Sequence, residues 1–148
     1  MRQNPVSIKT NSQNKVTLQK KISSMNELHI GDLTIELPII QGGMGIGVSM
    51  SGLAAAVANE GGVGVIAVAG LGMFEHDYAK NFLEANTRAL KKEIQKAREL
   101  SSGVLGVNIM VALTNFADLV KTSISEGIDI IFSGAGLPLN LPQFLTTE

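Results

Sequence analysis

Residues 38–49 read Pro-Ile-Ile-Gln-Gly-Gly-Met-Gly-Ile-Gly-Val-Ser, and this stretch decides how the rest of the chain is interpreted. A short apolar run ends in a loop that is dense in glycine, and an alanine-rich helical segment follows directly. Glycine lets the main chain reach positive φ and lets its amide groups approach a ligand that a Cβ would hold off. The free N–H groups at the start of the next helix point to the same place. The stretch therefore predicts one wall of a cofactor site.

The same unit of apolar run, glycines and helical segment repeats along the chain. A small hairpin is expected at 28–36. Strands are expected at 37–41, 63–68, 104–110 and 129–133, and helices at about 50–59, 75–101 and 116–126, with a possible break in the second helix near Asn86. Apolar strands that alternate with helices predict an α/β fold with a parallel sheet. An open doubly wound sheet and a (βα) barrel both remain possible, and in both the ligand binds at the carboxyl ends of the strands.

The first expected helix follows the glycine loop closely. Ser49 or Ser51 is expected to cap it, and Leu53 and Val57 are expected to form its apolar face. Capping explains the two serines better than nucleophilic catalysis does, because residues 47–51 do not have the G-x-S-x-G pattern. The many alanines are expected to let this helix lie close to the sheet.

Composition limits the function classes. The 148 residues are 45% hydrophobic and 17% charged, which is typical of a globular protein, and they contain no cysteine. Thiolate chemistry is therefore excluded, and a cytoplasmic location is expected. Five of the basic residues precede Glu27, so the remainder carries 7 basic and 13 acidic residues and offers no footprint for nucleic acid. Residues 1–26 are expected to be a flexible polar tail, and no apolar run is long enough to cross a membrane.

Two side chains at expected strand ends are candidates for ligand contact. Met44 lies between glycines with no obvious core to fill, and a soft thioether beside a planar ring is a plausible use. Asn108 is polar within a buried strand, so it needs a partner. That partner is either a neighbouring main-chain carbonyl or the alternating donor and acceptor edge of a flavin. No metal site is expected, His29 and His76 are expected to be structural or solvated, and neither a dinucleotide fingerprint nor a P-loop is present.

Four blocks of sequence together resemble the nitronate monooxygenase family, formerly called 2-nitropropane dioxygenases. They are the glycine loop from Pro38, the segment 53–64, Gly106-Val-Asn-Ile-Met110 and Ser133-Gly-Ala-Gly-Leu-Pro138. The blocks also resemble those of the related flavin-dependent enoyl-acyl-carrier-protein reductases. The resemblance implies a (βα)8 TIM barrel that binds FMN, in which an alkyl nitronate is oxidised with O2 to a carbonyl compound and nitrite.

Carried onto this sequence, the resemblance implies two groups of site residues. The FMN ring would be contacted by Gly42, Gly43, Met44, Gly45 and Asn108. The substrate pocket would be formed by Ser133, Gly134, Ala135 and Gly136. The family's catalytic histidine belongs to a Gly-Gly-His segment of the second half of the barrel, and this sequence has no such segment, so no catalytic residue is assigned.

A complete barrel needs roughly 250 residues, so residues 27–148 are expected to form only its first half, with four parallel strands. A half-barrel leaves open apolar edges, and the missing half or a second chain is therefore expected as a partner. Alone, the 148 residues are expected to be colourless and inactive. Two other functions stay open: an enoyl reductase that uses NAD(P)H, and a non-catalytic, truncated half-barrel.

Overall fold

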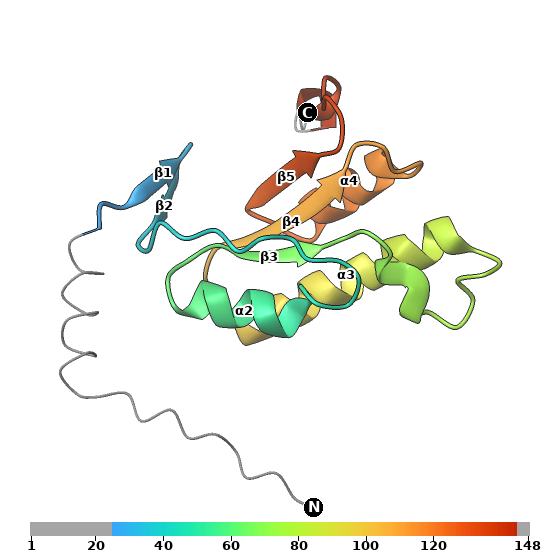
Figure 1. Cartoon of the computed structure of the whole chain (residues 1–148), viewed down its shortest axis with the longest axis horizontal. Helices are drawn as coiled ribbons and strands as arrows, with labels where there is room; N and C mark the ends of the chain where they lie inside the picture. Colours follow the sequence, from blue (N-terminus) through green and yellow to red (C-terminus); the bar gives the residue numbers. More distant parts are fainter. Residues whose placement is uncertain (1–24, 145–148) are drawn as a thin grey trace, which may run out of the picture.

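The computed structural model describes residues 25–144, in which three helices lie on one side of a small parallel sheet (Figure 1). The expected tail at 1–26 lies almost entirely outside these residues. The elements in chain order are β1 (Leu28–Ile30), β2 (Leu33–Ile35), α2 (Ser51–Asn59), β3 (Gly64–Ala67), η1 (Leu71–Phe74), α3 (Phe82–Leu100), β4 (Leu105–Met110), α4 (Phe116–Ser125), β5 (Ile130–Gly134) and η2 (Leu141–Phe144). The expected hairpin is confirmed, because β1 and β2 pair in antiparallel fashion across Gly31, which has φ +58°.

The sheet has the order β3-β4-β5, and both pairs are parallel. The expected strand at 37–41 runs beside β3 in the parallel sense but is linked to it by a single bridge at Ile40. The Val63 N–H donates to the carbonyl of Ile39 at 2.9 Å, and the Gln41 N–H donates to the carbonyl of Val63 at 3.0 Å. Three strands and one extended segment therefore stand where four strands were expected, and the described residues form no closed barrel.

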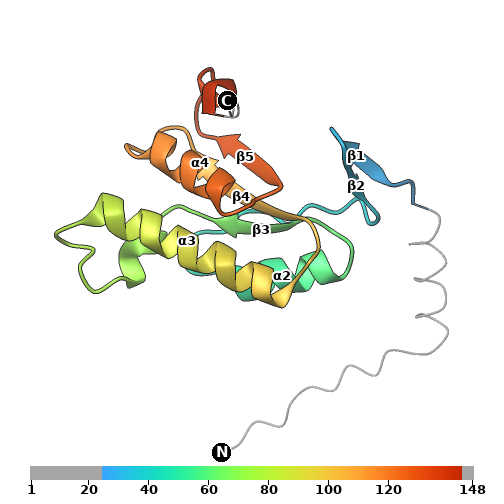
Figure 2. The same ribbon diagram turned by 180° about the vertical axis from the view of Figure 1, so that it is seen from behind.

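The three helices cover one face of the sheet (Figure 2), and their buried apolar residues pack against it. Ile66, Val107 and Ile109 of the sheet are fully buried against Leu90 and Ile94 of α3. The spacing of these α3 residues is that of one helical face, which explains why the segment folds against the sheet. The helix is shorter at its start than expected, and the break expected near Asn86 is wrong, since α3 continues through this residue to Leu100.

Helix α2 packs closely against β3 through alanines, as the sequence predicted. An added Cβ at Gly64 would lie 1.8 Å from the carbonyl oxygen of Ala54, so only glycine fits at this crossing. The apolar face expected from Leu53 is wrong: its side chain is 39% exposed, and the buried apolar face consists of Ala54, Ala55 and Ala58. Only small side chains fit between α2 and β3, because the helix approaches the strand too closely for leucine.

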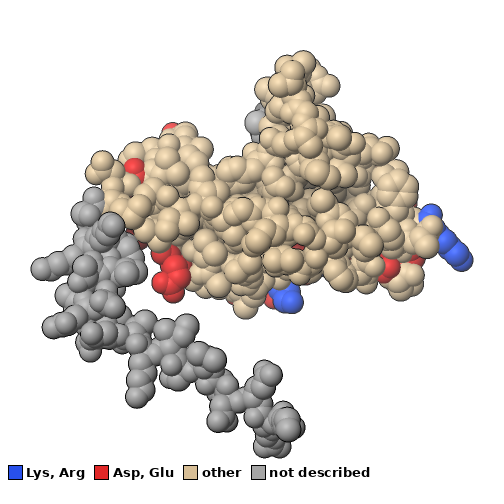
Figure 3. Space-filling model, viewed as in Figure 1, with Lys and Arg blue, Asp and Glu red and all other residues tan. Residues whose placement is uncertain are grey.

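The other side of the sheet carries Val65, Asn108 and Phe132, and part of it packs against Ile35 of the hairpin. Figure 3 shows that the side of the molecule seen in Figure 1 consists almost wholly of residues other than Asp, Glu, Lys and Arg, with the charged side chains near its margins. A surface with so few charges suits contact with further protein or with a large organic ligand. None of the helices within residues 25–144 is both long enough and apolar enough to span a bilayer.

Candidate functional site

The glycine loop and Asn108, which are far apart in the sequence, lie against each other at the carboxyl ends of β3 and β4. A Cβ added at Gly43 would lie 2.5 Å from the Cβ of Asn108 and 2.8 Å from its Cγ. Such distances are far below ordinary contact between carbon atoms, so the Gly43 main chain rests directly on the Asn108 side chain. The structure therefore brings together the two strongest candidates of the sequence.

The Asn108 side chain is only weakly engaged. Its Nδ2 donates to the carbonyl of Phe132 at 3.4 Å, which is long for an N–H···O hydrogen bond. Its Oδ1 accepts no hydrogen bond from any other residue between 25 and 144. The carbonyl partner considered from the sequence is thus present, yet the amide keeps an acceptor and donor capacity for a ligand.

The loop itself is exposed where a ligand would contact it. Met44 is 47% exposed, and Ile46 and Val48 are exposed as well. The far side of the loop packs on η1, where a Cβ added at Gly47 would lie 2.8 Å from Cζ of Phe74. An exposed methionine on a supported loop agrees with the ligand contact predicted for Met44, which stays a prediction, as do the contacts assigned to Gly42 and Gly45.

The expected capping of α2 by serine is wrong. Met50 is the N-cap residue of this helix, and no side chain of the N-cap bonds to the first turn. Glu93 of α3 replaces the cap instead, because its Oε2 accepts a hydrogen bond from the Ser51 N–H at 2.7 Å. A carboxylate at a helix N-terminus also interacts favourably with the helix dipole. Glu93 therefore fixes the start of the helix that follows the loop.

Strand β5 ends at the same edge of the sheet, but the side chain of Ser133, its next-to-last residue, lies on the other face. Ser133 pairs with Ile109, which is fully buried beneath the helices, so the serine hydroxyl lies on the helix side of β5. That hydroxyl is buried and has no hydrogen-bond partner within residues 25–144. Ala135 has φ +53° and Gly136 has φ +150°. The substrate contacts predicted for Ser133, Gly134, Ala135 and Gly136 remain predictions.

A cleft of about 420 Å³ adjoins this turn. It lies between the segments that follow β4 and β5, and its lining includes Val111, Phe116, Leu137 and Phe144. Its lining is mostly apolar, and it opens at the carboxyl ends of the strands, where both architectures considered from the sequence place a ligand.

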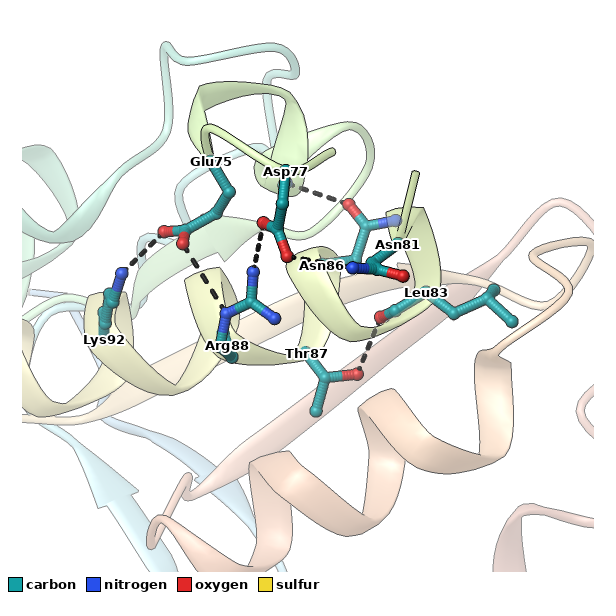
Figure 4. A network of polar contacts seen from close by, with 9 residues as sticks. Glu75, Asp77, Asn81, Leu83, Asn86, Thr87, Arg88 and Lys92 are labelled. Atoms are coloured by element: carbon teal, nitrogen blue, oxygen red, sulfur yellow. Dashed lines mark hydrogen bonds and ion pairs between the residues drawn. The ribbon is translucent and has the colours of Figure 1, made fainter. Parts of the chain in front are cut away.

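An ion-pair network holds the segment between β3 and α3 in place (Figure 4). Glu75 accepts a hydrogen bond from Nζ of Lys92 at 2.7 Å and lies 3.6 Å from Nε of Arg88, which also pairs with Asp77. The hydrogen bond from Lys92, together with the charge of Arg88, lowers the pKa of the Glu75 carboxyl. The sequence placed both carboxylates at the start of a helix. In the structure they precede α3 and anchor the segment that carries Phe74 beneath the glycine loop.

His76 lies between these two carboxylates. One ligand-type atom from each of Glu75, His76 and Asp77 falls within 4.8 Å of the others. Both carboxylates already pair with Arg88 or Lys92, so their charge is balanced by side chains of α3. No metal site was expected from the sequence, and the ion pairs account for this cluster of residues.

The chain is similar to known proteins over the part that contains the glycine loop and Asn108. The family described as "Nitronate monooxygenase" matches residues 26–131. Proteins called "Probable nitronate monooxygenase" from Staphylococcus aureus strains JH9 and Newman are each 42% identical to this chain over 79 residues. The aligned part is 53% of this chain and 18% of each of those proteins.

Solved structures of FabK from Thermotoga maritima share the fold. A mutant form is 33% identical, with a TM-score of 0.60, and the match covers 75% of this chain and 32% of that one. A second FabK structure from the same organism is 32% identical, with a TM-score of 0.56, and the match covers 74% of this chain and 32% of that one. The chain therefore spans about a fifth of the curated relatives it matches and about a third of the solved ones.

Proposed function

The chain belongs to the nitronate monooxygenase family, and from this premise we propose that it is the first part of an FMN-dependent oxidoreductase that converts alkyl nitronates and O2 to carbonyl compounds and nitrite. The observation that carries the proposal is the contact between Gly43 and Asn108 at the carboxyl ends of the strands. It places a main-chain wall and a free amide edge side by side, which is what a flat heterocycle with alternating donors and acceptors needs.

The residues present fit such a ring. The space beside Gly42 is open, since a Cβ added there would meet no atom within 4 Å, whereas a Cβ added at Gly43 would meet the Asn108 side chain. Met44 adds an exposed thioether beside the loop. A planar ligand could thus lie along the main chain of Gly42, Gly43, Met44 and Gly45, with the Asn108 amide at its edge.

In this proposal the protein binds and orients, and the cofactor supplies the redox step. Bound FMN would supply the electron transfer between the nitronate and O2 that amino-acid side chains do not provide. The Oδ1 and Nδ2 atoms of Asn108 would fix the orientation of the ring, and the loop would exclude water from one of its sides. The turn at 134–136 and the adjoining cleft would receive the nitronate.

The proposed architecture is the first half of a TIM barrel in residues 27–148. The parallel sheet with helices on one side and the likeness to FabK support this proposal. A barrel of this kind needs four further strands, supplied by the remaining part of a longer protein or by a second chain. We propose that the 148 residues alone are colourless and inactive for this reason. The cysteine-free composition supports a cytoplasmic location.

A second function is supported by a specific observation. The solved structures that resemble this chain are of FabK. The resemblance to flavin-dependent enoyl-acyl-carrier-protein reductases makes an NAD(P)H-dependent reduction of an enoyl thioester the alternative enzymatic proposal. A non-catalytic half-barrel is the alternative from another class.

One experiment separates the three. The protein is expressed from its complete reading frame, and its flavin is measured by absorbance and identified by mass spectrometry. Nitrite release from propyl nitronate is then compared with NADH oxidation in the presence of a crotonyl thioester. Nitrite release with bound FMN is the expected result. NADH oxidation without nitrite release would favour the enoyl reductase over the monooxygenase. A protein that binds no flavin and has neither activity would favour the non-catalytic half-barrel.

A further inference from the structure

We propose that Gln41 and Ser49 are positioning residues that hold the glycine loop at 42–48 in its ligand-contacting shape. The inference rests on the proposed function in one respect, namely that this loop contacts FMN. Neither side chain is among the residues assigned to the ligand, and Ser49 was expected to cap the helix that follows the loop.

Along the edge of β3 that faces away from β4, the main-chain groups find hydrogen-bond partners in three different ways. At Val63 the partners are main-chain groups, because its N–H donates to the carbonyl of Ile39 and its carbonyl accepts from the Gln41 N–H. At Ala67 the N–H donates to the carbonyl of Ser49 at 2.9 Å. Between these two positions the main chain of residues 42–48 has left the sheet to form the loop.

The Gln41 side chain fills the gap at Val65. Its Nε2 donates to the carbonyl of Val65 at 2.9 Å, and its Oε1 accepts from the Val65 N–H at 3.3 Å. A primary amide carries the same donor and acceptor as a peptide group, so it can take the place of the missing strand residue. The loop can therefore turn towards Asn108 without leaving buried main-chain groups of β3 unpaired.

The Ser49 hydroxyl fixes the loop from inside. It accepts from the Met44 N–H at 3.0 Å and from Nε2 of Gln41 at 3.0 Å, and it donates to the carbonyl of Gly42 at 3.1 Å. A hydroxyl offers one donor and two acceptor positions, so all of its capacity is used. Ser49 is 1% exposed, and its own N–H donates to the carbonyl of Met44 at 2.9 Å.

A loop with this composition needs such support. Glycine loses more conformational freedom than any other residue when it is ordered, and residues 42–47 contain four glycines on an exposed segment. A loop that is already ordered binds more tightly, because the entropy of ordering is not lost on binding. Together, Gln41 and Ser49 link the loop to β3 at two neighbouring positions, and Gly43 rests on Asn108 between them.

The test compares Ser49→Ala and Gln41→Glu with Ser123→Ala. Ser123 is a matched control, because its fully buried hydroxyl makes a hydrogen bond, to the Leu119 carbonyl at 2.8 Å on α4, away from the loop. Two quantities are measured in the protein expressed from its complete reading frame: the dissociation constant of FMN, from quenching of flavin fluorescence, and the hydrogen exchange rate of the Met44 amide. Thermal unfolding reports the general loss of stability in each variant.

We expect Ser49→Ala and Gln41→Glu to weaken FMN binding by about tenfold or more and to speed Met44 exchange by a similar factor. The Ser123→Ala variant is expected to leave both unchanged at a comparable loss of thermal stability. Ser49→Thr, which keeps the hydroxyl, should restore Met44 protection. Unchanged Met44 exchange in both loop variants would overturn the inference, and so would equal FMN affinity in the wild type and in Ser49→Ala. If the wild type binds no FMN, the proposed function fails, and the exchange rates alone decide whether the loop is held as inferred.

Discussion

The contact between Gly43 and Asn108 makes a prediction about two adjacent glycines. Replacing Gly43 by alanine puts a Cβ 2.5 Å from the Asn108 Cβ, whereas the same change at Gly42 meets nothing within 4 Å. Carbon atoms in contact lie about 3.5–4.0 Å apart, so either the loop or the Asn108 side chain must move by about 1 Å. Overpacking of this kind costs about 1–3 kcal/mol. We therefore expect Gly43→Ala to lower the free energy of unfolding by that amount, and Gly42→Ala to change it by less than about 0.5 kcal/mol.

The assay is urea unfolding followed by far-UV circular dichroism, because the chain has no tryptophan. A double-mutant cycle with Asn108→Gly, which removes the opposing atoms, identifies the cause: the cost of Gly43→Ala should shrink by about 1 kcal/mol or more in that background. The side-chain amide resonance of Asn108 should shift in Gly43→Ala and stay in place in Gly42→Ala. Equal effects of the two glycine substitutions on unfolding, within about 0.5 kcal/mol, would refute the packing on which the cofactor site rests.

Three further predictions concern the frame around the site. Gly64→Ala should lower the free energy of unfolding by about 4 kcal/mol or more, because its Cβ would lie 1.8 Å from the main chain of α2. Gly52→Ala, within α2 itself, has open space around its Cβ and should raise the free energy of unfolding by about 0.5–1 kcal/mol. Urea unfolding of the two variants measures both changes. Ala135→Gly should raise the unfolding temperature slightly, because φ +53° costs an alanine about 1–2 kcal/mol, and a lower temperature would contradict this. Because the pKa of Glu75 is lowered in the folded state, its ion pair stabilises the fold at pH values above 4.5, the ordinary pKa of a glutamate. This stabilisation is lost as the pH falls through the lower pKa of the folded state. The thermal stability should therefore drop below about pH 4.5, and it should drop less in Lys92→Met.

Much of the fold could be predicted from the sequence because its signals are local. The apolar runs at 63–68 and 104–110 lie within one or two residues of β3 and β4, and the alternation around Gly31 gave the hairpin. Helix boundaries were less predictable. The start of α3 was placed too early, because the acidic residues that resemble a first turn are instead held by ion pairs with the same helix, a tertiary contact with no local signal.

The candidate site was predicted in part. The glycine loop and Asn108 carried visible signals, since clustered glycines and a polar residue in an apolar strand are both unusual. Ser49 was misassigned and the role of Glu93 was missed, because the partners of both side chains depend on the fold: the serine bonds back into its own loop, and the glutamate bonds to the start of α2. The orientation of the Ser133 side chain could not be predicted, because the face of the strand on which a residue lies depends on register, which a run of apolar residues does not reveal.

The hydrogen bonds of Gln41 also affect how the protein avoids aggregation. A foreign strand can add to a sheet only where N–H and C=O groups are free, and such edges promote association between chains. At Val65 both groups are already bonded to the side chain of one glutamine, so an incoming strand finds no partner at this point. Pro38, which has no N–H, begins the extended segment on the same side. The Gln41 side chain thus protects the sheet edge at Val65, beyond the bridge at Ile40. It also leaves the main chain of the glycine loop free to bind a ligand.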